Sequence, residues 1–232
     1  KEASYLAVSA GMDMHMHGPK FPEAVVALVK EGKLPMQRVN EACEKILTAK
    51  FKLGLFENRT VDIKSIPDKI FTTEHQQVAL ETARKGIVLL KNEGLLPLEK
   101  TISKKRILVT GPNANNQTIL GDWHSPQPDE KVITIFEGLK TVGSKFGYDL
   151  EFFDSGENIR KIKDNTIATA AHKAKDVDYV VLVVGDNAMR YRWKDKTAGE
   201  NMGRAALDLP GKQLDLVKAI EATGTPIIIV LV

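Results

Sequence analysis

Two segments of this chain are apolar without interruption, and both are rich in β-branched residues. Tyr179–Val184 reads YVVLVV, and Ile227–Val232 reads IIIVLV. A strand with one face in water alternates apolar and polar residues, whereas a strand that is buried on both faces does not. The two segments therefore predict strands of a sheet that is covered on both sides.

Other short apolar segments alternate with helical patterns along most of the chain. The further strands that we predict are Ile87–Leu90, Lys105–Thr110 and Leu150–Phe153. The helices that we predict between the strands are Glu74–Arg84, Ile133–Phe146, Thr166–Lys175 and Gly211–Ala222. Strands that alternate with helices favour an α/β fold with a mostly parallel sheet sandwiched by helices.

The first part of the chain has a helical pattern without alternating strands. One helix begins near Pro22, and a second extends from Pro35 to Gly54 with apolar residues at helical spacing. Cys43, the only cysteine, lies on the apolar side of the second helix, which predicts a buried thiol. Residues 58–73 have no clean period and indicate a linker.

The net charge and the length of the apolar segments argue against nucleic acid and membrane as partners. The 33 basic residues nearly balance the 30 acidic residues, and the net charge is +3 without a basic stripe. This balance argues against nucleic acid as a partner, and the apolar segments are too short to span a membrane.

The chain begins with Lys1 instead of methionine and ends inside a predicted core strand, so we expect it to be a piece of a longer protein.

In parallel sheets, ligand sites form in the loops that follow the carboxyl ends of the strands. The loops that qualify here are Gly111–Pro128, Asp154–Asn158 and Gly185–Leu209. The last of them is 25 residues long and rich in aromatic residues and arginine, and loops of that length are usually functional or disordered. It contains Glu200, a carboxyl that can act as an acid catalyst if its surroundings hold a proton near neutral pH. A solvated surface glutamate is the commoner interpretation when the residues are considered alone.

Several motifs, in order along nearly the whole chain, resemble those of family 3 glycoside hydrolases. In the second part of the chain the resemblance rests on Ala83–Asn92, Leu95–Leu98, Gly111–Ala114, Leu120–Trp123 and Ala198–Gln213. In the first part it rests on Ala10–Met14, Val29–Leu34 and Arg38–Phe56. Each motif is weak by itself, and their number and order make the set specific.

The resemblance implies a (β/α)8-type barrel followed by an α/β sandwich, with the active site between them. Residues 1–56 are then expected to form the C-terminal end of the barrel, residues 57–73 an interdomain linker, and residues 74–232 a sandwich that is truncated at its C-terminal side. The resemblance further implies a retaining, exo-acting β-glycosidase of the β-glucosidase or β-xylosidase type, which removes terminal β-linked glucose or xylose from oligosaccharides or glycosides. It implies no cofactor and no metal.

The resemblance also assigns roles to individual residues. Glu200 corresponds to the general acid/base, whereas the nucleophilic aspartate is expected on a barrel strand before this chain, which by itself is then inactive. Trp123 corresponds to an aromatic residue beside the leaving-group sugar, although a partly buried tryptophan between domains fits equally well. Arg192 and Trp193 are predicted to shape the same pocket, although packing at a surface is the commoner role for such residues.

One departure from the family pattern affects the same loop. Family members commonly have Asp-Arg after the acid/base, whereas this chain has Gly203-Arg204, so the loop is less firmly anchored or another carboxylate such as Asp195 substitutes. A non-catalytic carbohydrate-binding or interaction module therefore stays open as an alternative. A nucleotide-binding domain is disfavoured, because the loop after Thr110 lacks the spaced glycines of a phosphate-binding loop.

Two weaker signals concern metal binding and export. Asp13, His15 and His17 alternate and would share one face of a strand, yet a polar strand end fits them better than a metal site. The resemblance favours a periplasmic or secreted location, whereas Lys1–Tyr5 has no signal-peptide pattern.

Overall fold

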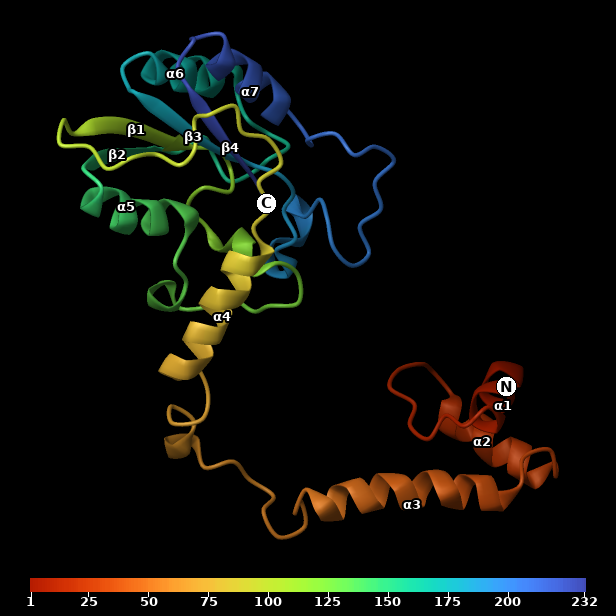
Figure 1. Cartoon of the computed structure of the whole chain (residues 1–232). Helices are drawn as coiled ribbons and strands as arrows, with labels where there is room; N and C mark the ends of the chain where they lie inside the picture. Colours follow the sequence, from red (N-terminus) through yellow and green to blue (C-terminus); the bar gives the residue numbers. More distant parts are fainter. The chain divides into compact units, whose positions relative to one another are not determined.

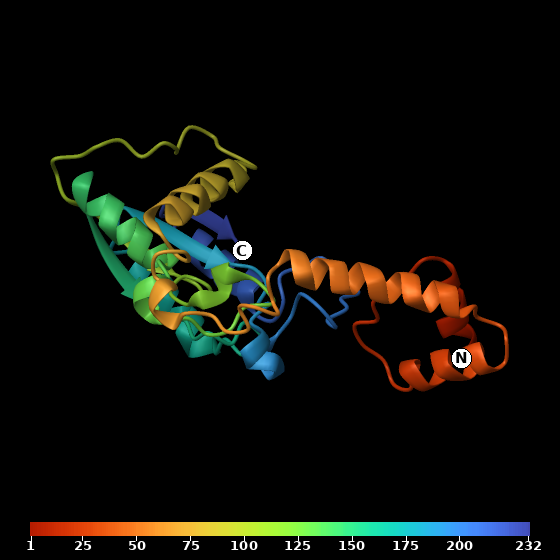
Figure 2. The same cartoon turned by 90° about the horizontal axis from the view of Figure 1, so that it is seen from below.

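The computed structural model describes the whole chain, Lys1–Val232, as two compact units. Unit 1 comprises Lys1–Val88 and is helical, whereas unit 2 comprises Leu89–Val232 and contains a β-sheet (Figures 1 and 2). None of the helices is long and apolar enough to cross a lipid bilayer.

Unit 1 consists of helices and the loops that connect them. The bounds of the helices are α1 (Glu2–Ser9), α2 (Phe21–Lys30), α3 (Met36–Lys52), the short 3-10 helix η1 (Ile63–Ser65) and α4 (Thr73–Gly86). α2 has a proline in its first turn, where the missing N–H costs no helical hydrogen bond. Thr72 caps α4 by accepting a hydrogen bond from the His75 N–H. The small core of this unit is formed by Val8, Leu28 and Leu34.

Two sequence predictions for this part of the chain are wrong. Cys43 is exposed, because α3 buries none of its residues. Ile87–Leu90 is not a strand, and its four apolar side chains are 63% to 79% exposed. A short apolar segment indicates a tendency to be buried, but it does not supply the neighbouring strand that a ladder of hydrogen bonds requires.

Unit 2 is built on a four-stranded parallel sheet. The strands are β1 (Lys105–Thr110), β2 (Tyr148–Phe153), β3 (Tyr179–Val184) and β4 (Ile227–Leu231), in the order β2-β1-β3-β4. In register, Ile107 of β1 lies opposite Leu150 on one side and Tyr179 on the other. The predicted α/β fold with a parallel sheet is therefore confirmed.

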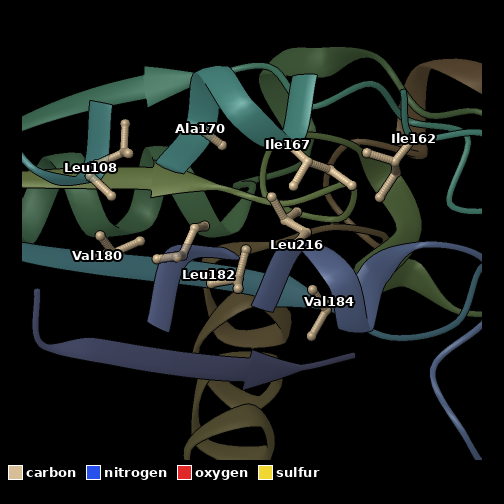
Figure 3. Packing of buried hydrophobic residues seen from close by; sticks show 10 residues of the cluster. Leu108, Ile162, Ile167, Ala170, Val180, Leu182, Val184 and Leu216 are labelled. Atoms are coloured by element: carbon tan, nitrogen blue, oxygen red, sulfur yellow. The ribbon is translucent and has the colours of Figure 1, made fainter. Parts of the chain in front are cut away.

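Helices cover both faces of this sheet, with α5 (Ile135–Lys145) on one face and α6 (Asp164–Ala174) and α7 (Gln213–Glu221) on the other (Figure 1). The buried cluster on the side of α6 and α7 (Figure 3) contains Leu108, Ile162, Ile167, Ala170, Ala174, Val180, Leu182, Val184, Leu216 and Ile220. The cluster on the side of α5 contains Ile107, Val109, Ala114, Tyr148, Val181 and Val183. Successive residues of β3 alternate between the two clusters, which is why YVVLVV contains no charged residue. Each buried Leu or Ile stabilises the folded state by roughly 1.5–3 kcal/mol. The two clusters therefore hold the strands in place, and with them the strand ends at which the loops begin.

The strand order reverses between β1 and β3, since β2 lies beside β1 on one side and β4 lies beside β3 on the other. The loops after β1 and β3 therefore diverge from the same end of the sheet, which is where ligand sites form in parallel sheets. Gly111, the first residue after β1, has φ +109°, and a side chain at this position would overlap the Val183 backbone. Glycine thus lets the loop after β1 begin directly beside β3.

Candidate functional site

Two loops of unit 2 form the candidate site. The loop after β1 comprises residues 111–134 and contains the 3-10 helices η2 (Gln117–Leu120) and η3 (Asp129–Lys131). The loop after β3 comprises residues 185–212 and contains the 3-10 helix η4 (Arg190–Asp195). A hydrogen bond of 2.7 Å from the Glu200 N–H to Asp122 Oδ2 connects the two loops.

The first part of the loop after β3 is held by buried polar groups. Asn187 and Thr197 are both fully buried. The Asn187 N–H donates to Thr197 Oγ1 (2.9 Å), and the Thr197 hydroxyl donates to Asp186 Oδ1 (2.8 Å). Gln213, at the start of α7, bonds both the N–H and the C=O of Gly185. The loop therefore has a fixed path up to Thr197 despite its length.

Glu200 is held through its backbone on both sides. Its N–H donates to Asp122 Oδ2, and its C=O accepts from Lys196 Nζ (3.0 Å). Lys196 Nζ also donates to Asp122 Oδ2 (2.8 Å). Gly199 has φ +87°, and a side chain at this position would overlap the Asp122 carboxylate. Glycine before Glu200 therefore allows the close approach of the two loops.

The surroundings of Asp122 stabilise its ionised form. The hydrogen bond from Lys196, and then those from the N–H groups of Glu200 and Trp123, lower the pKa of the Asp122 carboxyl from 3.8 to about 2, against the opposing effect of burial. At neutral pH Asp122 is therefore a charged hydrogen-bond acceptor for its three donors.

Arg190 lies against both Trp123 and Glu200. Its guanidinium carbon is 3.7 Å from the centroid of the Trp123 ring. One of its terminal nitrogens forms an ion pair with Glu200 Oε2, and its Nε lies 3.8 Å from Asp122 Oδ1. Trp123 is 72% exposed and the Glu200 side chain 46% exposed, so both remain accessible to a ligand.

Arg192 and Trp193 have different neighbours, although both lie in η4. Arg192 forms ion pairs with Glu157 and with Asp195 (3.0 Å). It lines a polar cavity of about 540 Å³ whose lining includes neither Trp123 nor Glu200. Trp193 is half-exposed, and its ring centroid lies 5.1 Å from Lys196 Nζ. The structure thus brings Glu200, Trp123 and Trp193 to the Lys196–Asp122 ion pair, and it places Arg192 on the cavity.

The carboxylate that binds the Glu200 segment is Asp122. Asp195, which the sequence offered as a substitute anchor, instead accepts hydrogen bonds from Asn158 (2.7 Å) and Arg192 (3.0 Å). Arg204, the residue after Gly203, forms an ion pair of 2.5 Å with Asp186. The part of the loop after Glu200 therefore has an ionic anchor without the aspartate that the family pattern has at position 203.

Sequence reasoning missed Asp122 and Lys196 as members of the site. The one available signal was the position of Asp122 directly before Trp123. Lys196 gave no signal, because a lysine in a polar loop is nearly always solvated, whereas this one is fully buried.

The alternating Asp13, His15 and His17 of unit 1 do not form a strand. Asp13 forms ion pairs with Lys45 (2.9 Å) and Arg38 (2.6 Å), and these hydrogen bonds lower the pKa of its carboxyl. His15 stacks on Phe21 with ring centroids 4.1 Å apart. No group of three or more metal-ligating side chains gathers anywhere in the structure.

Comparison with known families and proteins gives consistent matches. The model of the glycosyl hydrolase family 3 C-terminal domain matches residues 87–232. A β-xylosidase from Formosa agariphila is 36% identical over 100% of this chain and 32% of its own length. A periplasmic β-glucosidase from Salmonella typhimurium is 29% identical, again over 100% of this chain and 32% of its own length.

Solved structures give the same result. A β-glucosidase involved in saponin metabolism from intestinal bacteria has a TM-score of 0.83 at 31% identity and covers 100% of this chain and 34% of its own. The β-glucosidase from Listeria innocua in complex with glucose has a TM-score of 0.79 at 28% identity, with 100% of this chain and 30% of its own covered. The chain therefore spans about a third of the length of the relatives that it matches.

Proposed function

This chain belongs to glycosyl hydrolase family 3, and from that premise we propose that Glu200 is the general acid/base of a retaining, exo-acting β-glycosidase. One observation carries the proposal: the Glu200 side chain is 46% exposed, yet its backbone is bound on both sides. A general acid must reach the leaving oxygen and must also be held in a productive position. Glu200 combines accessibility with a fixed backbone.

In the proposed reaction, two carboxyl groups act on the anomeric carbon of a β-glycoside. An aspartate of a barrel domain attacks this carbon while Glu200 transfers its proton to the glycosidic oxygen, which leaves with the electrons of the broken C–O bond. Glu200, now ionised, then removes a proton from the water that displaces the aspartate. The two displacements release the sugar with retained configuration.

The ion pair with Arg190 orients the Glu200 carboxyl group. It engages Glu200 Oε2 and leaves Oε1 for the glycosidic oxygen or the water. A charge-assisted hydrogen bond from a guanidinium has a defined direction. Arg190 therefore limits the orientations that the Glu200 side chain adopts relative to the substrate.

The remaining elements of the proposal follow from family membership. Residues 1–56 form the end of the barrel, residues 57–73 the linker and residues 74–232 the sandwich, while the nucleophile comes from barrel sequence outside this chain.

The substrate is an oligosaccharide or β-glycoside with terminal β-linked glucose or xylose, two sugars that the names of the relatives support. Trp123 contacts the leaving-group sugar, and Trp193 and Arg192 contact substrate further from Glu200, Arg192 in the polar cavity that it lines. The name of the Salmonella relative supports a periplasmic or secreted location.

The test is the substitution Glu200→Ala in the full-length enzyme, with Glu221→Ala as the control because Glu221 is exposed on α7. With a disaccharide, kcat/KM should fall by about 10²–10⁴-fold, since the leaving sugar then departs without a proton. With an aryl glycoside whose leaving group needs little protonation, kcat and KM should fall together and kcat/KM should change little. Azide should restore kcat with the aryl glycoside, because it replaces the water that Glu200 no longer activates.

A small loss with the disaccharide, together with no rescue by azide, would contradict the assignment of Glu200. The alternative, a non-catalytic carbohydrate-binding module, draws its support from Gly203. It predicts that the wild-type protein binds such sugars in a calorimetric titration and does not hydrolyse them.

A further inference from the structure

Lys196 is a fully buried lysine, with no exposed side-chain surface. Lysine is among the residues that are least often buried, and an ammonium group removed from water must be paired. A buried lysine in a loop of this kind therefore requires an explanation beyond packing. Its partners supply that explanation.

The Lys196 ammonium group binds both Asp122 and the Glu200 backbone. Nζ donates to Asp122 Oδ2 at 2.8 Å and to the Glu200 C=O at 3.0 Å, and it lies 5.1 Å from the Trp193 ring centroid. Lys196 thus connects the loop after β1, through Asp122, to the backbone of the candidate acid/base, Glu200.

Asp122 binds the same segment from the other side. Its Oδ2 accepts the Glu200 N–H at 2.7 Å, and its Oδ1 accepts the Trp123 N–H at 2.8 Å. The peptide groups before and after Glu200 are therefore both tied to one ion pair. The same ion pair fixes the backbone of Trp123, so the aromatic residue and the carboxyl share one support.

We propose that Lys196 and Asp122 are positioning residues for Glu200: their buried ion pair holds both peptide groups of Glu200, so that its carboxyl is aimed at the leaving oxygen. This inference rests on the proposed function of Glu200 and adds to it the means by which the loop is aimed. A displacement of about 1 Å can cost on the order of 10²-fold in rate, so a backbone support of this kind affects catalysis without contact with the substrate. The Arg190 guanidinium is the one other cation close to the Lys196–Asp122 ion pair, with its Nε 3.8 Å from Asp122 Oδ1.

The test compares Lys196→Met with wild type in the full-length enzyme, since methionine keeps the length of the side chain and removes its charge. With a disaccharide, kcat/KM should fall by about 10–100-fold, because a displaced Glu200 protonates the leaving group poorly. With an activated aryl glycoside, kcat and KM should fall together and kcat/KM should stay within about threefold of wild type, because that leaving group needs little protonation. Azide should restore part of the kcat with the aryl glycoside.

The control is Lys173→Met. Lys173 lies on α6, outside both loops, and the substitution removes its ion pair of 2.5 Å with Glu151 of β2. It should leave both substrates unaffected. A purely structural role of Lys196 predicts a different result, namely an equal fall of kcat/KM for both substrates as the folded fraction decreases. That result, or no loss with either substrate, overturns the proposal.

Asp122→Asn provides a second variant with the same shape and without the charge, and it should show the same dependence on the leaving group. If both variants fail to fold, the ion pair serves the fold and the proposal is wrong. Glu200→Ala separates the two levels of inference. If Glu200→Ala shows the dependence on the leaving group and Lys196→Met does not, only the positioning role fails; if Glu200→Ala does not show it, the proposed function fails.

Discussion

The loop after β3 has two parts that are held in different ways. The anchored part, residues 185–197, contains side chains that are fully buried: Asn187, Met189, Lys196 and Thr197. The outer part, residues 198–212, contains Leu207, whose side chain is entirely exposed, and its ion pairs are partly exposed. They join Glu200 to Arg190, Arg204 to Asp186 and Lys212 to Asp164.

Glu200 lies just beyond the point where the buried anchors end. Binding and catalytic groups are commonly carried by loops that a rigid scaffold positions. Here the scaffold is extended into the loop itself, because buried polar groups hold the chain as far as Thr197 and the Lys196–Asp122 ion pair binds the backbone of Glu200. The difference between the two parts indicates that the anchored part, together with Asp122 of the loop after β1, determines the position of the carboxyl.

The largest effect is expected from Thr197→Val, which keeps the shape of the side chain and removes its hydroxyl. The substitution leaves the buried Asn187 N–H without an acceptor, and such a loss costs about 1–3 kcal/mol of unfolding free energy. It also removes the donor to Asp186 Oδ1, whereas Asp186 Oδ2 keeps its ion pair with Arg204. Urea unfolding of this chain measures the change. The control is Thr141→Val on the exposed side of α5, where the change should stay within about 0.5 kcal/mol. Equal effects of the two substitutions would show that residues 185–197 are not specially anchored.

A smaller effect is expected from acid, through Asp122 of the loop after β1, which binds Lys196 in the anchored part and Glu200 in the outer part. Its pKa is about 2 in the folded chain and 3.8 without its partners, so its ionised form is favoured by folding. The stabilisation is therefore fully present above about pH 4 and is lost as the pH falls from there through about 2. Unfolding free energies of wild type and Asp122→Asn, measured from pH 5 to pH 2, should converge toward the acid end. A difference that stays constant over this range would contradict the assigned ion pair.

The strands that support this loop could be predicted from the sequence. The bounds of β1 and β3 agree with the predicted segments. β3 is apolar throughout because it is buried on both faces, and β1 has an apolar centre, Ile107–Val109, for the same reason. The same signal failed at Ile87–Leu90, where the apolar residues are present and the neighbouring strand is not. Cys43 failed for a related reason, since the apolar side of α3 is not buried in this structure.

The support of the candidate site could not be predicted. Lys196 and Asp122 are 74 residues apart in the chain, and a pair at that separation leaves no local pattern. Their contact follows from the strand order, which places the loops after β1 and β3 side by side, and from Gly199, which lets the two loops approach. Sequence motifs identified the residue that is proposed to act, and only the structure identified the residues that hold it.

The smallest effect is expected from Arg204→Gln in the outer part. Its ion pair with Asp186 is partly exposed, with 26% and 32% of the two side chains accessible, and exposed pairs of this kind contribute about 0.2–1 kcal/mol. Leu207→Ser provides the control, because a fully exposed side chain changes the unfolding free energy by about 0.5 kcal/mol or less. Urea unfolding under the conditions used for Thr197→Val puts the three variants on one scale. A loss with Arg204→Gln as large as that with Thr197→Val would mean that both parts of the loop are held equally, and that Arg204 takes over the role of the aspartate that Gly203 replaces. A loss at or below 1 kcal/mol would leave the Lys196–Asp122 ion pair as the last strong support before Glu200.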